Sequence, residues 1–453
     1  MEGREVPVFD SAMSTRAAPP ITTTGLRSNG VANKLSPQDS PVHSWYRFVL
    51  SFPPHLVRDY LTRFNAGPSS IVLDPFCGTG TTLVEAKKLG IASVGIEAHP
   101  MAHFAAVTKT NWEPDPEHLT NHARQVAAYT RTLLDQDGLG DFPLHGNGHG
   151  SRQLLALPAQ ADALLLGESI SPLPLHKTLR LVSALRHLND PALSFHENLA
   201  LANALVFSIS NLHFGPEVGV RDIKSDAPVV APWMQAVRNI ASHLAQYGRL
   251  AEVPSTVLLG DARVVDQLLD PGTIDIVFTS PPYPNEKDYT RTTRLETVLL
   301  GFLSNKPELR ELKQTLVRSN TRNVYKSDHD DEWIASFPEI AEIAERIETR
   351  RLQLGKTSGF ERLYHRVALL YFGGMARHLD SLRSCLRPGA HLGYVVGDQA
   401  SYLRVKIPTG VLLARLAQSL GYELISIDLF RTRLATATRE QLREEVVVLK
   451  WPG

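Results

Sequence analysis

Short apolar runs alternate with amphipathic stretches along much of this 453-residue chain. Runs rich in β-branched residues predict buried strands at 70–73, 92–96, 256–259 and 274–278. Between the first two strands, residues 81–90 predict a helix that ends at a glycine. The succession of strand, helix and strand is typical of a parallel sheet covered by helices.

The C-terminal third continues this alternation. Helices are predicted over 360–386 and 408–420, with a turn at 387–389 between the first helix and the next strand. The strands predicted in this third cover 390–396, 423–427 and 444–450. We therefore expect an α/β protein with a mostly parallel sheet and helices on both faces.

The region 104–255 has a different pattern and predicts a largely helical insertion. Its amphipathic stretches predict helices over 117–136, 173–188 and 232–250, and 211–219 is loop-like. Such an insertion lies at an edge of the sheet where loops tolerate added chain. It could hold a target-recognition surface, a dimer contact or a structural cover.

The first segment with candidate chemistry follows the strand at 70–73. Gly78 and Gly80 permit backbone angles and a close approach that a side chain would block. Glu97, at the end of the second strand, is placed to accept hydrogen bonds from ribose hydroxyls. The alternative is an ordinary turn with a surface glutamate. The candidate cofactor-binding residues of the turn are Asp74, Pro75, Phe76, Cys77, Gly78, Thr79, Gly80, Thr81 and Thr82.

The second segment lies about 200 residues further along. Asp261, followed by Ala262, is placed to accept a hydrogen bond from an adenine amino group, or else to cap the next short helix. The strand at 274–278 runs directly into Thr279 and then Ser280-Pro281-Pro282-Tyr283. The two prolines fix the backbone, so the Ser280 hydroxyl and the Pro281 carbonyl could accept hydrogen bonds from one amino group. Tyr283 offers a ring face; the alternative is a proline turn with a packed tyrosine.

These two segments resemble the motifs of amino-group DNA methyltransferases, which make N4-methylcytosine or N6-methyladenine. The resemblance implies a Rossmann-like class I methyltransferase fold, S-adenosyl-L-methionine bound at the glycine segment, and catalysis by Ser280–Tyr283. Serine in the first place is more usual among the N4-cytosine enzymes, and aspartate among the N6-adenine enzymes. The stretch 43–48, with Trp45, resembles the family's additional cofactor motif. Asn285, Asp288, Tyr289 and Arg291 extend the match.

The resemblance covers about 41–103, 256–300 and 359–453, and it suggests six regions. They are a flexible arm (1–40), a first catalytic part that binds cofactor (41–103), the insertion (104–255), a second catalytic part with the catalytic loop (256–300), a variable basic region (301–358) and a C-terminal catalytic part (359–453). Target recognition is expected in the insertion, in the basic region or in both.

The residues suit methyl transfer to nitrogen. An exocyclic amine is a poor nucleophile because its lone pair is delocalised into the ring, and hydrogen bonds to Ser280 and the Pro281 carbonyl would favour a pyramidal geometry. A base inside a duplex must be flipped out to react, with Tyr283 stacked on it. Methylation at cytosine carbon 5 needs a thiolate, usually after a proline. Neither Cys77 nor Cys385 follows a proline, which excludes that reaction.

Composition is consistent with a cytoplasmic enzyme. Two cysteines provide neither a disulfide framework nor a zinc site. The sequence has no apolar run long enough for a membrane span and no signal-peptide core. His145 and His149 lack convincing metal spacing, so a loop and no metal site are expected there.

Charge is the difficulty for a nucleic-acid enzyme, since Lys+Arg and Asp+Glu both number 47. A local excess lies in 291–326, which has eight basic and three acidic residues. This run predicts either a DNA-facing surface or a solvated helix face. The candidate nucleic-acid contacts are Asn285, Asp288, Tyr289, Arg291, Arg294, Arg318 and Arg322.

The expected partner is double-stranded DNA, with a cognate restriction endonuclease as a second candidate. Three alternatives stay open: an N6-adenine DNA methyltransferase, an RNA base methyltransferase, and a DNA-binding subunit with an idle site. The sequence leaves the oligomeric state open.

Overall fold

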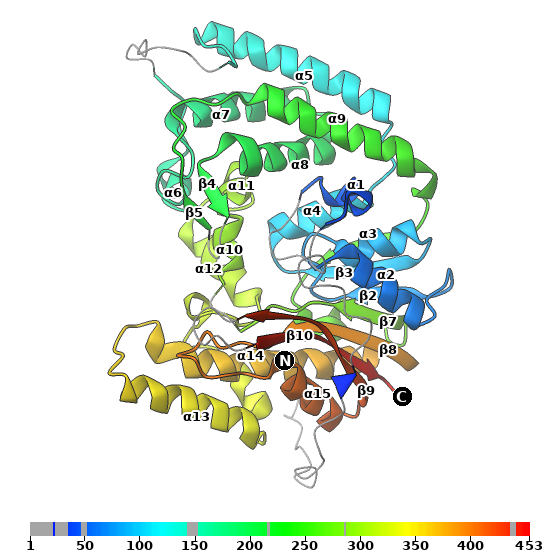
Figure 1. Ribbon diagram of the computed structural model, residues 1–453. Coiled ribbons are helices and arrows are strands. Elements are labelled where there is room, and N and C mark those ends of the chain that lie inside the picture. Colours follow the sequence, from blue (N-terminus) through cyan, green and yellow to red (C-terminus); the bar gives the residue numbers. More distant parts are fainter. Residues whose placement is uncertain are drawn as a thin grey trace.

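The computed structural model describes residues 21–22, 35–46, 52–142, 153–214, 218–284, 287–434 and 441–453. Their main feature is an eight-stranded sheet in the order β1-β9-β10-β8-β7-β2-β3-β6 (Figure 1). Within these ranges only β10 pairs antiparallel to its neighbours in this sheet. The strands are β1 (Ile21–Thr22), β2 (Ile71–Asp74), β3 (Ala92–Glu97), β6 (Ser255–Leu259), β7 (Ile274–Thr279), β8 (Leu386–Gly397), β9 (Glu423–Leu434) and β10 (Gln441–Lys450).

Helices cover both faces of the sheet because its strands alternate apolar side chains between the two faces. Val72 and Phe278 pack with α2 (Pro54–Arg63) and α3 (Thr81–Lys88). Their neighbours Leu73 and Val277 pack on the opposite face with α13 (Pro338–Gln353), α14 (Tyr364–Leu382) and α15 (Thr409–Ser419).

The strand order places a crevice where the chain changes direction. From β2 the chain proceeds to β3 and β6 on one side, and it returns to β7 and β8 on the other. Open α/β sheets bind ligands at the carboxyl ends of the strands beside such a switch point. With the antiparallel β10 inserted between β8 and β9, this is a Rossmann-like methyltransferase fold, which confirms the predicted fold class.

The helices predicted between β3 and β6 are present, with shifted ends. They pack into one core with α4 (Pro100–Thr110), so the expected boundary at 104 falls inside a helix of the sheet domain. The loop expected at 211–219 contains the β4–β5 hairpin. The elements are α5 (Pro116–Gln136), α6 (Ala159–Asp162), α7 (Pro172–His187), α8 (Ser194–Ala204), the π-helix η3 (Leu205–Ile209), β4 (Leu212–Phe214), β5 (Val218–Val220) and α9 (Val230–Tyr247).

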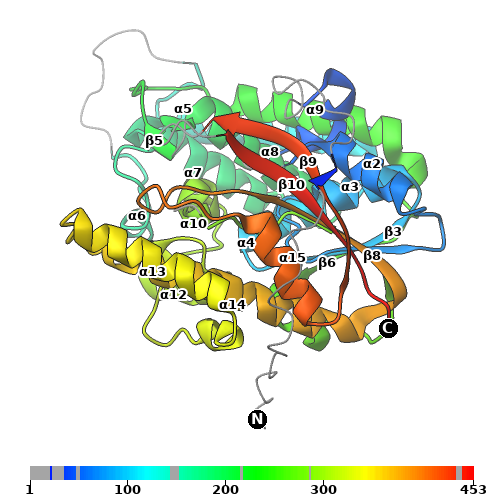
Figure 2. The ribbon, with the colours of Figure 1, turned by 60° about the horizontal axis from the view of Figure 1, so that its bottom comes forward.

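Two further predictions differ at the C-terminal end. The turn expected at 387–389 is part of β8, and β9 continues seven residues beyond the predicted end at 427. The extension forms because β9 and β10 pair past Gly397, the last residue of β8. Figure 2 shows these two strands continuing together beyond the rest of the sheet.

Short elements connect the main ones, and no helix in the described ranges has the length and apolar character that a membrane span requires. The connecting elements are η2 (Pro37–Asp39), α1 (Ser40–His43), η4 (Gly248–Leu250), η5 (Ala262–Gln267), α10 (Tyr289–Thr292), α11 (Arg294–Leu299), α12 (Lys306–Thr315), η6 (Thr321–Asn323), η7 (Asp330–Ile334), η8 (Glu361–Leu363) and η9 (Arg383–Cys385). Most of the arm at 1–40, and the loop with His145 and His149, lie outside the described residues.

Candidate active site

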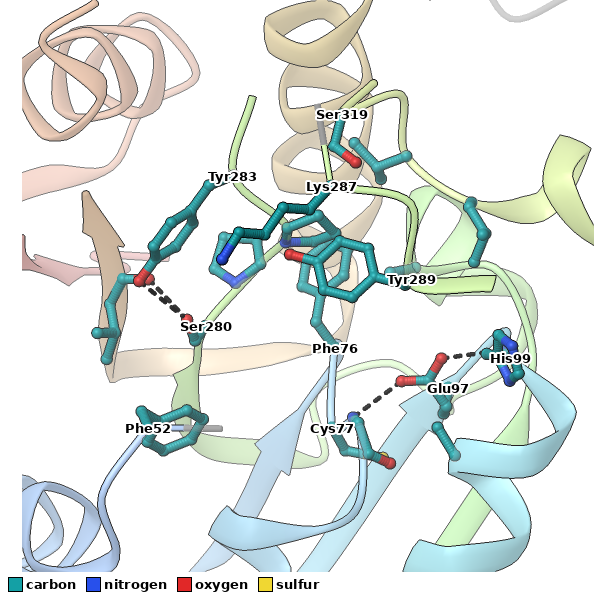
Figure 3. A pocket seen from close by; sticks show the side chains of 18 of the residues that line it. Phe52, Phe76, Cys77, Glu97, His99, Ser280, Tyr283, Lys287, Tyr289 and Ser319 are labelled. Atoms are coloured by element: carbon teal, nitrogen blue, oxygen red, sulfur yellow. Dashed lines mark hydrogen bonds between the residues drawn. The ribbon is translucent and has the colours of Figure 1, made fainter. Parts of the chain in front are cut away.

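A cavity of about 510 Å³ lies at the carboxyl ends of β2, β3 and β7 and brings the two predicted segments together (Figure 3). Segments about 200 residues apart in sequence thus share one chamber. The predicted residues that line it are Pro75, Phe76, Cys77, Gly78, Thr79, Thr81, Glu97, Asp261, Ala262, Ser280, Pro281, Pro282, Tyr283 and Tyr289. The predicted residues outside the lining are Trp45, Asp74, Gly80, Thr82, Asp288, Arg291, Arg294, Arg318 and Arg322. Asn285 lies outside the described residues.

The glycine turn between β2 and α3 has the conformation that its sequence predicts. Gly78 and Gly80 have φ angles of +53° and +82°, which side chains disfavour. Gly80 also lies against α4, where an added Cβ would come within 3.2 Å of Ala106 Cβ. At Gly78 the space around such a Cβ is open. The turn therefore exposes backbone to the cavity at Gly78.

Glu97 is fixed by backbone donors at the end of β3. One carboxylate oxygen accepts from the Gly78 N–H and the other from the His99 N–H, both at 2.8 Å. Burial raises the pKa of Glu97 to about 7, although these two hydrogen bonds oppose the shift. Two lone pairs of the carboxylate remain for hydroxyl donors, which suits a ribose.

Hydrogen bonds join the glycine turn to the strand that carries the catalytic segment. The Thr279 hydroxyl donates to Asp74 Oδ1 at 2.6 Å, and the Thr82 hydroxyl donates to the Phe278 carbonyl at 3.1 Å. Burial raises the pKa of Asp74 to about 6. Asp74 and Thr82, predicted to bind cofactor, thus lie behind the cavity and hold its two halves together.

The sequence left two roles open for Asp261, a ligand contact or a helix cap. In the structure Asp261 caps η5 and also lines the cavity. Its carboxylate accepts from the Arg263 N–H at 2.9 Å at the start of η5. The Arg263 guanidinium pairs with the same carboxylate at 2.6 Å and with Asp330 at 2.6 Å. These contacts hold the Asp261 carboxylate in place at the cavity wall.

In the catalytic segment, the hydroxyl of Ser280 already donates a hydrogen bond within the protein. Ser280 Oγ donates to the Val395 carbonyl on β8 at 3.1 Å, and it lies 3.4 Å from the Tyr283 hydroxyl. Tyr283 packs against β8 at Gly397, where an added Cβ would come within 3.3 Å of the ring. Burial raises the pKa of Tyr283, so its phenol stays neutral.

Trp45, expected in the cofactor site, has a different role. It is 2 % exposed, and its indole N–H donates to His243 Nδ1 on α9 at 2.9 Å. The Asn203 amide on α8 donates to the carbonyls of Ser44 and Trp45. These contacts attach the N-terminal segment to the helical insertion, so the prediction is corrected.

Three of the candidate nucleic-acid contacts are buried and engaged within the protein. Arg318 is 2 % exposed and forms a two-pronged pair with Asp328 at 2.9 and 2.7 Å. Arg294 donates to the carbonyls of Thr290 and Leu164. Asp288 caps α10 and pairs with Lys313 at 2.9 Å. Their hydrogen bonds stabilise the folded chain, which corrects the predicted surface role; Arg291 and Arg322 are partly exposed.

Sequence reasoning missed several residues of the cavity. Lys287 follows the catalytic segment closely and its side chain extends over the cavity beside Tyr289 (Figure 3), so its proximity to Tyr283 was an available signal. His99 lies two residues after Glu97, so it too had a local signal. Residues that come from distant elements and carried no such signal include Phe52, Asn323, Gln399, Phe430 and Arg433.

Comparisons with known proteins find methyltransferases that resemble this chain. The N6/N4 methyltransferase family model, described as DNA methylase, matches residues 31–107. Type II methyltransferase M.BsoBI from Geobacillus stearothermophilus is 24% identical over 447 residues, covering 91% of this chain and 85% of the relative. Type II methyltransferase M.AvaI from Nostoc sp. is 20% identical over 494 residues, covering 99% and 94%. These matches support the amino-methyltransferase family for this chain.

Other matches are shorter or more distant. Type II methyltransferase M.MjaII from Methanocaldococcus jannaschii is 42% identical over 69 residues, which is 15% of this chain and 13% of the relative. A solved rRNA methyltransferase from Streptomyces viridochromogenes aligns over 91% of this chain and 94% of that one, with 11% identity. Its TM-score of 0.31 carries no argument about substrate.

The cofactor of this chain is S-adenosyl-L-methionine, and the cavity fits it. Open space at Gly78 lets a ligand lie against the backbone. Glu97 supplies acceptors for ribose hydroxyls beside that turn, and Asp261 supplies a carboxylate that an adenine amine can donate to.

Proposed function

We propose that this amino-methyltransferase transfers a methyl group to the N4 amine of cytosine in a base flipped out of double-stranded DNA. The observation that carries the proposal is the shared cavity, in which Ser280 faces the same chamber as Gly78 and Glu97. S-adenosylmethionine supplies an electrophilic methyl group on a sulfonium. The chain's own task is to place the amine in line with it.

Ser280 is suited to accept a hydrogen bond from the amine. Its proton is donated to the Val395 carbonyl, so lone pairs on Oγ remain for an incoming N–H. The Pro281 carbonyl would provide a second acceptor, since it lies beyond the end of β7 at Thr279. Two acceptors on one amine would draw its lone pair out of conjugation with the ring. The methylated amine is a strong acid and loses its proton to water, so no general base is required.

Tyr283 is suited to hold the flipped base. It is fixed against Gly397 and lies within hydrogen-bonding range of Ser280. A neutral phenol ring offers a stacking surface without placing a negative charge beside the base. The remaining turn residues Pro75, Phe76, Cys77, Thr79 and Thr81, with Ala262, would line the cofactor half of the cavity.

Serine at position 280 and the relatives support different parts of the proposal. By the family resemblance, serine in the first place favours cytosine N4 over adenine N6, which is the nearest alternative. The relatives' names, Type II methyltransferase, support DNA as the substrate and a place in a restriction–modification system with a cognate endonuclease. Target recognition would lie in the insertion after α4, in the region 301–358 or in both.

The test is the identity of the modified nucleoside. Mixed-sequence duplex DNA is incubated with the protein and S-adenosylmethionine, digested, and analysed by mass spectrometry. N4-methylcytosine is expected. N6-methyladenine would keep the mechanism and change the base, and methylation of RNA alone would overturn the DNA assignment. Silence on both substrates would favour an idle binding subunit, which calorimetry with the cofactor would then identify.

A further inference from the structure

A group of cations lies beside the cavity on elements that the predicted basic run does not include. The loop 398–407 follows β8, and the ribbon formed by 431–434 and 441–445 extends past its end. We call these segments together the basic wall. Gln399, Ser401, Arg431, Arg433 and Glu444 line the cavity, so the basic wall forms part of its rim.

The charges in the basic wall are arranged in layers. It contains five basic residues and three acidic ones. The side chains of Asp398 and Glu445 are 0 % and 1 % exposed, whereas those of Lys406 and Arg433 are 42 % and 39 % exposed. Arg404 is exposed as well. The carboxylates of Asp398 and Glu445 therefore lie beneath the surface, whereas the cations lie at the surface. The solvent-exposed charge of the basic wall is therefore positive.

Hydrogen bonds make the basic wall one rigid unit. Arg433 donates to the Asp398 carbonyl at 3.0 Å and to the Gln399 side chain at 2.9 Å. The Asp398 N–H donates to the Arg443 carbonyl at 2.8 Å. Leu442 packs on Ala400 between them. The loop and the ribbon cannot separate without breaking these contacts.

The turn that presents Arg404 is held in an unfavourable backbone conformation. Leu403 and Arg404 have φ angles of +54° and +65°, in a backbone region that residues other than glycine and asparagine seldom adopt. The Tyr402 hydroxyl, which donates to the Ser319 carbonyl at 3.0 Å, and a pair of backbone hydrogen bonds between Gln399 and Ile407 fix the turn. Arg404 is thus displayed at a defined place.

We infer that the basic wall binds the phosphates of duplex DNA that flank the flipped base, an inference that rests on the proposed function. A base that enters the cavity leaves its own phosphates at the rim, where the surface cations of the basic wall lie. Cations at such a position bind DNA phosphates and release the counterions that were condensed on the DNA. A two-stranded ribbon also has a width that the major groove admits.

The test compares exposed cations of the basic wall with one far from it. Arg404→Gln, Lys406→Gln and the double variant are set against Arg131→Gln, an exposed residue on α5, the helix farthest from the sheet (Figure 1). Binding to a labelled mixed-sequence duplex is measured over a range of salt concentrations. The slope of log affinity against log salt should become shallower by about 0.9 for each lost contact, and stay unchanged for Arg131→Gln. Thermal unfolding should be the same for Arg404→Gln and Arg131→Gln as for wild type. Lys406→Gln also removes a pair with the buried Asp398 carboxylate at 3.4 Å, so it and the double variant should unfold at a lower temperature.

Turnover separates this inference from the proposed function. The KM for DNA should rise in the variants of the basic wall, with kcat and cofactor affinity unchanged. Suppose that the wild-type protein methylates DNA and that Arg404→Gln and Lys406→Gln have the same salt slope as wild type. This result would overturn the inference about the basic wall and leave the proposed function standing. Wild-type protein that methylates RNA and ignores DNA would overturn the proposed function, and with it the duplex as the occupant of the basic wall.

Discussion

The basic run at 291–326 and the basic wall contain similar charges with different uses. In the run, Arg318 is bound to Asp328 and Lys313 to Asp288, both within the folded core. In the basic wall, it is the acids that are buried, and Lys406 and Arg433 reach solvent. A local excess of basic residues therefore does not identify a phosphate-binding surface. Whether such residues can bind phosphate depends on which member of each ion pair is buried, the acid or the base.

The largest effect expected concerns the buried pair. Arg318→Ala should destabilise the fold by about 3–5 kcal/mol, because it leaves the Asp328 carboxylate buried without its partner. Denaturant unfolding of the variant against wild type measures this, and Arg322→Ala, from the same run but partly exposed, is the matched control. A stable Arg318→Ala protein with weakened DNA binding would restore the original surface prediction.

Removal of the catalytic hydroxyl should come next. Ser280→Ala deletes one of the two proposed acceptors, and loss of one such transition-state hydrogen bond typically costs about 10²–10³ in kcat. Variants of neither basic region should show this signature, since the basic wall acts on DNA binding and the buried pairs of the run act on folding. Single-turnover methylation and cofactor calorimetry make the measurement. Equal turnover in Ser280→Ala and wild type would remove serine from the mechanism.

The double variant of the basic wall should have a smaller effect. Arg404→Gln/Lys406→Gln should reduce the salt dependence of DNA binding by about 1.8 in slope, twice the single-variant change. The comparison protein is Arg291→Gln/Arg322→Gln, which removes the two partly exposed arginines of the basic run. A larger loss in that comparison protein would move the phosphate contact back to 291–326.

The smallest effect is a pH dependence in the cofactor half of the site. The pKa of Glu97 is raised to about 7 by burial, so the free protein holds a proton there at lower pH. Ribose hydroxyls donate to the ionised carboxylate, and binding therefore requires that proton to leave. Cofactor affinity should increase about tenfold between pH 6 and pH 8. Glu97→Gln should bind more weakly, with a flat profile; a sloping profile in that variant would assign the titration to another group.

Much of the fold and the centre of the site were predictable, because their signals are local. Short apolar runs located β2, β3 and β7, and the helical stretch after the glycine turn located α3, each within a few residues. Gly80 was predictable because only glycine adopts its φ of +82° against Ala106 without strain. Trp45 was assigned wrongly because a tryptophan near a motif looks the same in sequence whether it contacts a ligand or, as here, His243.

The sequence by itself determined the two segments, the strands that carry them and the chemistry of their side chains. These depend on backbone preferences and on neighbours within a few residues. The tertiary structure alone decided that the Thr279 hydroxyl donates to Asp74, that the Ser280 hydroxyl donates to the Val395 carbonyl, and which cations reach solvent. Each of these depends on contacts between residues more than a hundred positions apart or on burial by the assembled fold, and neither is encoded in local pattern.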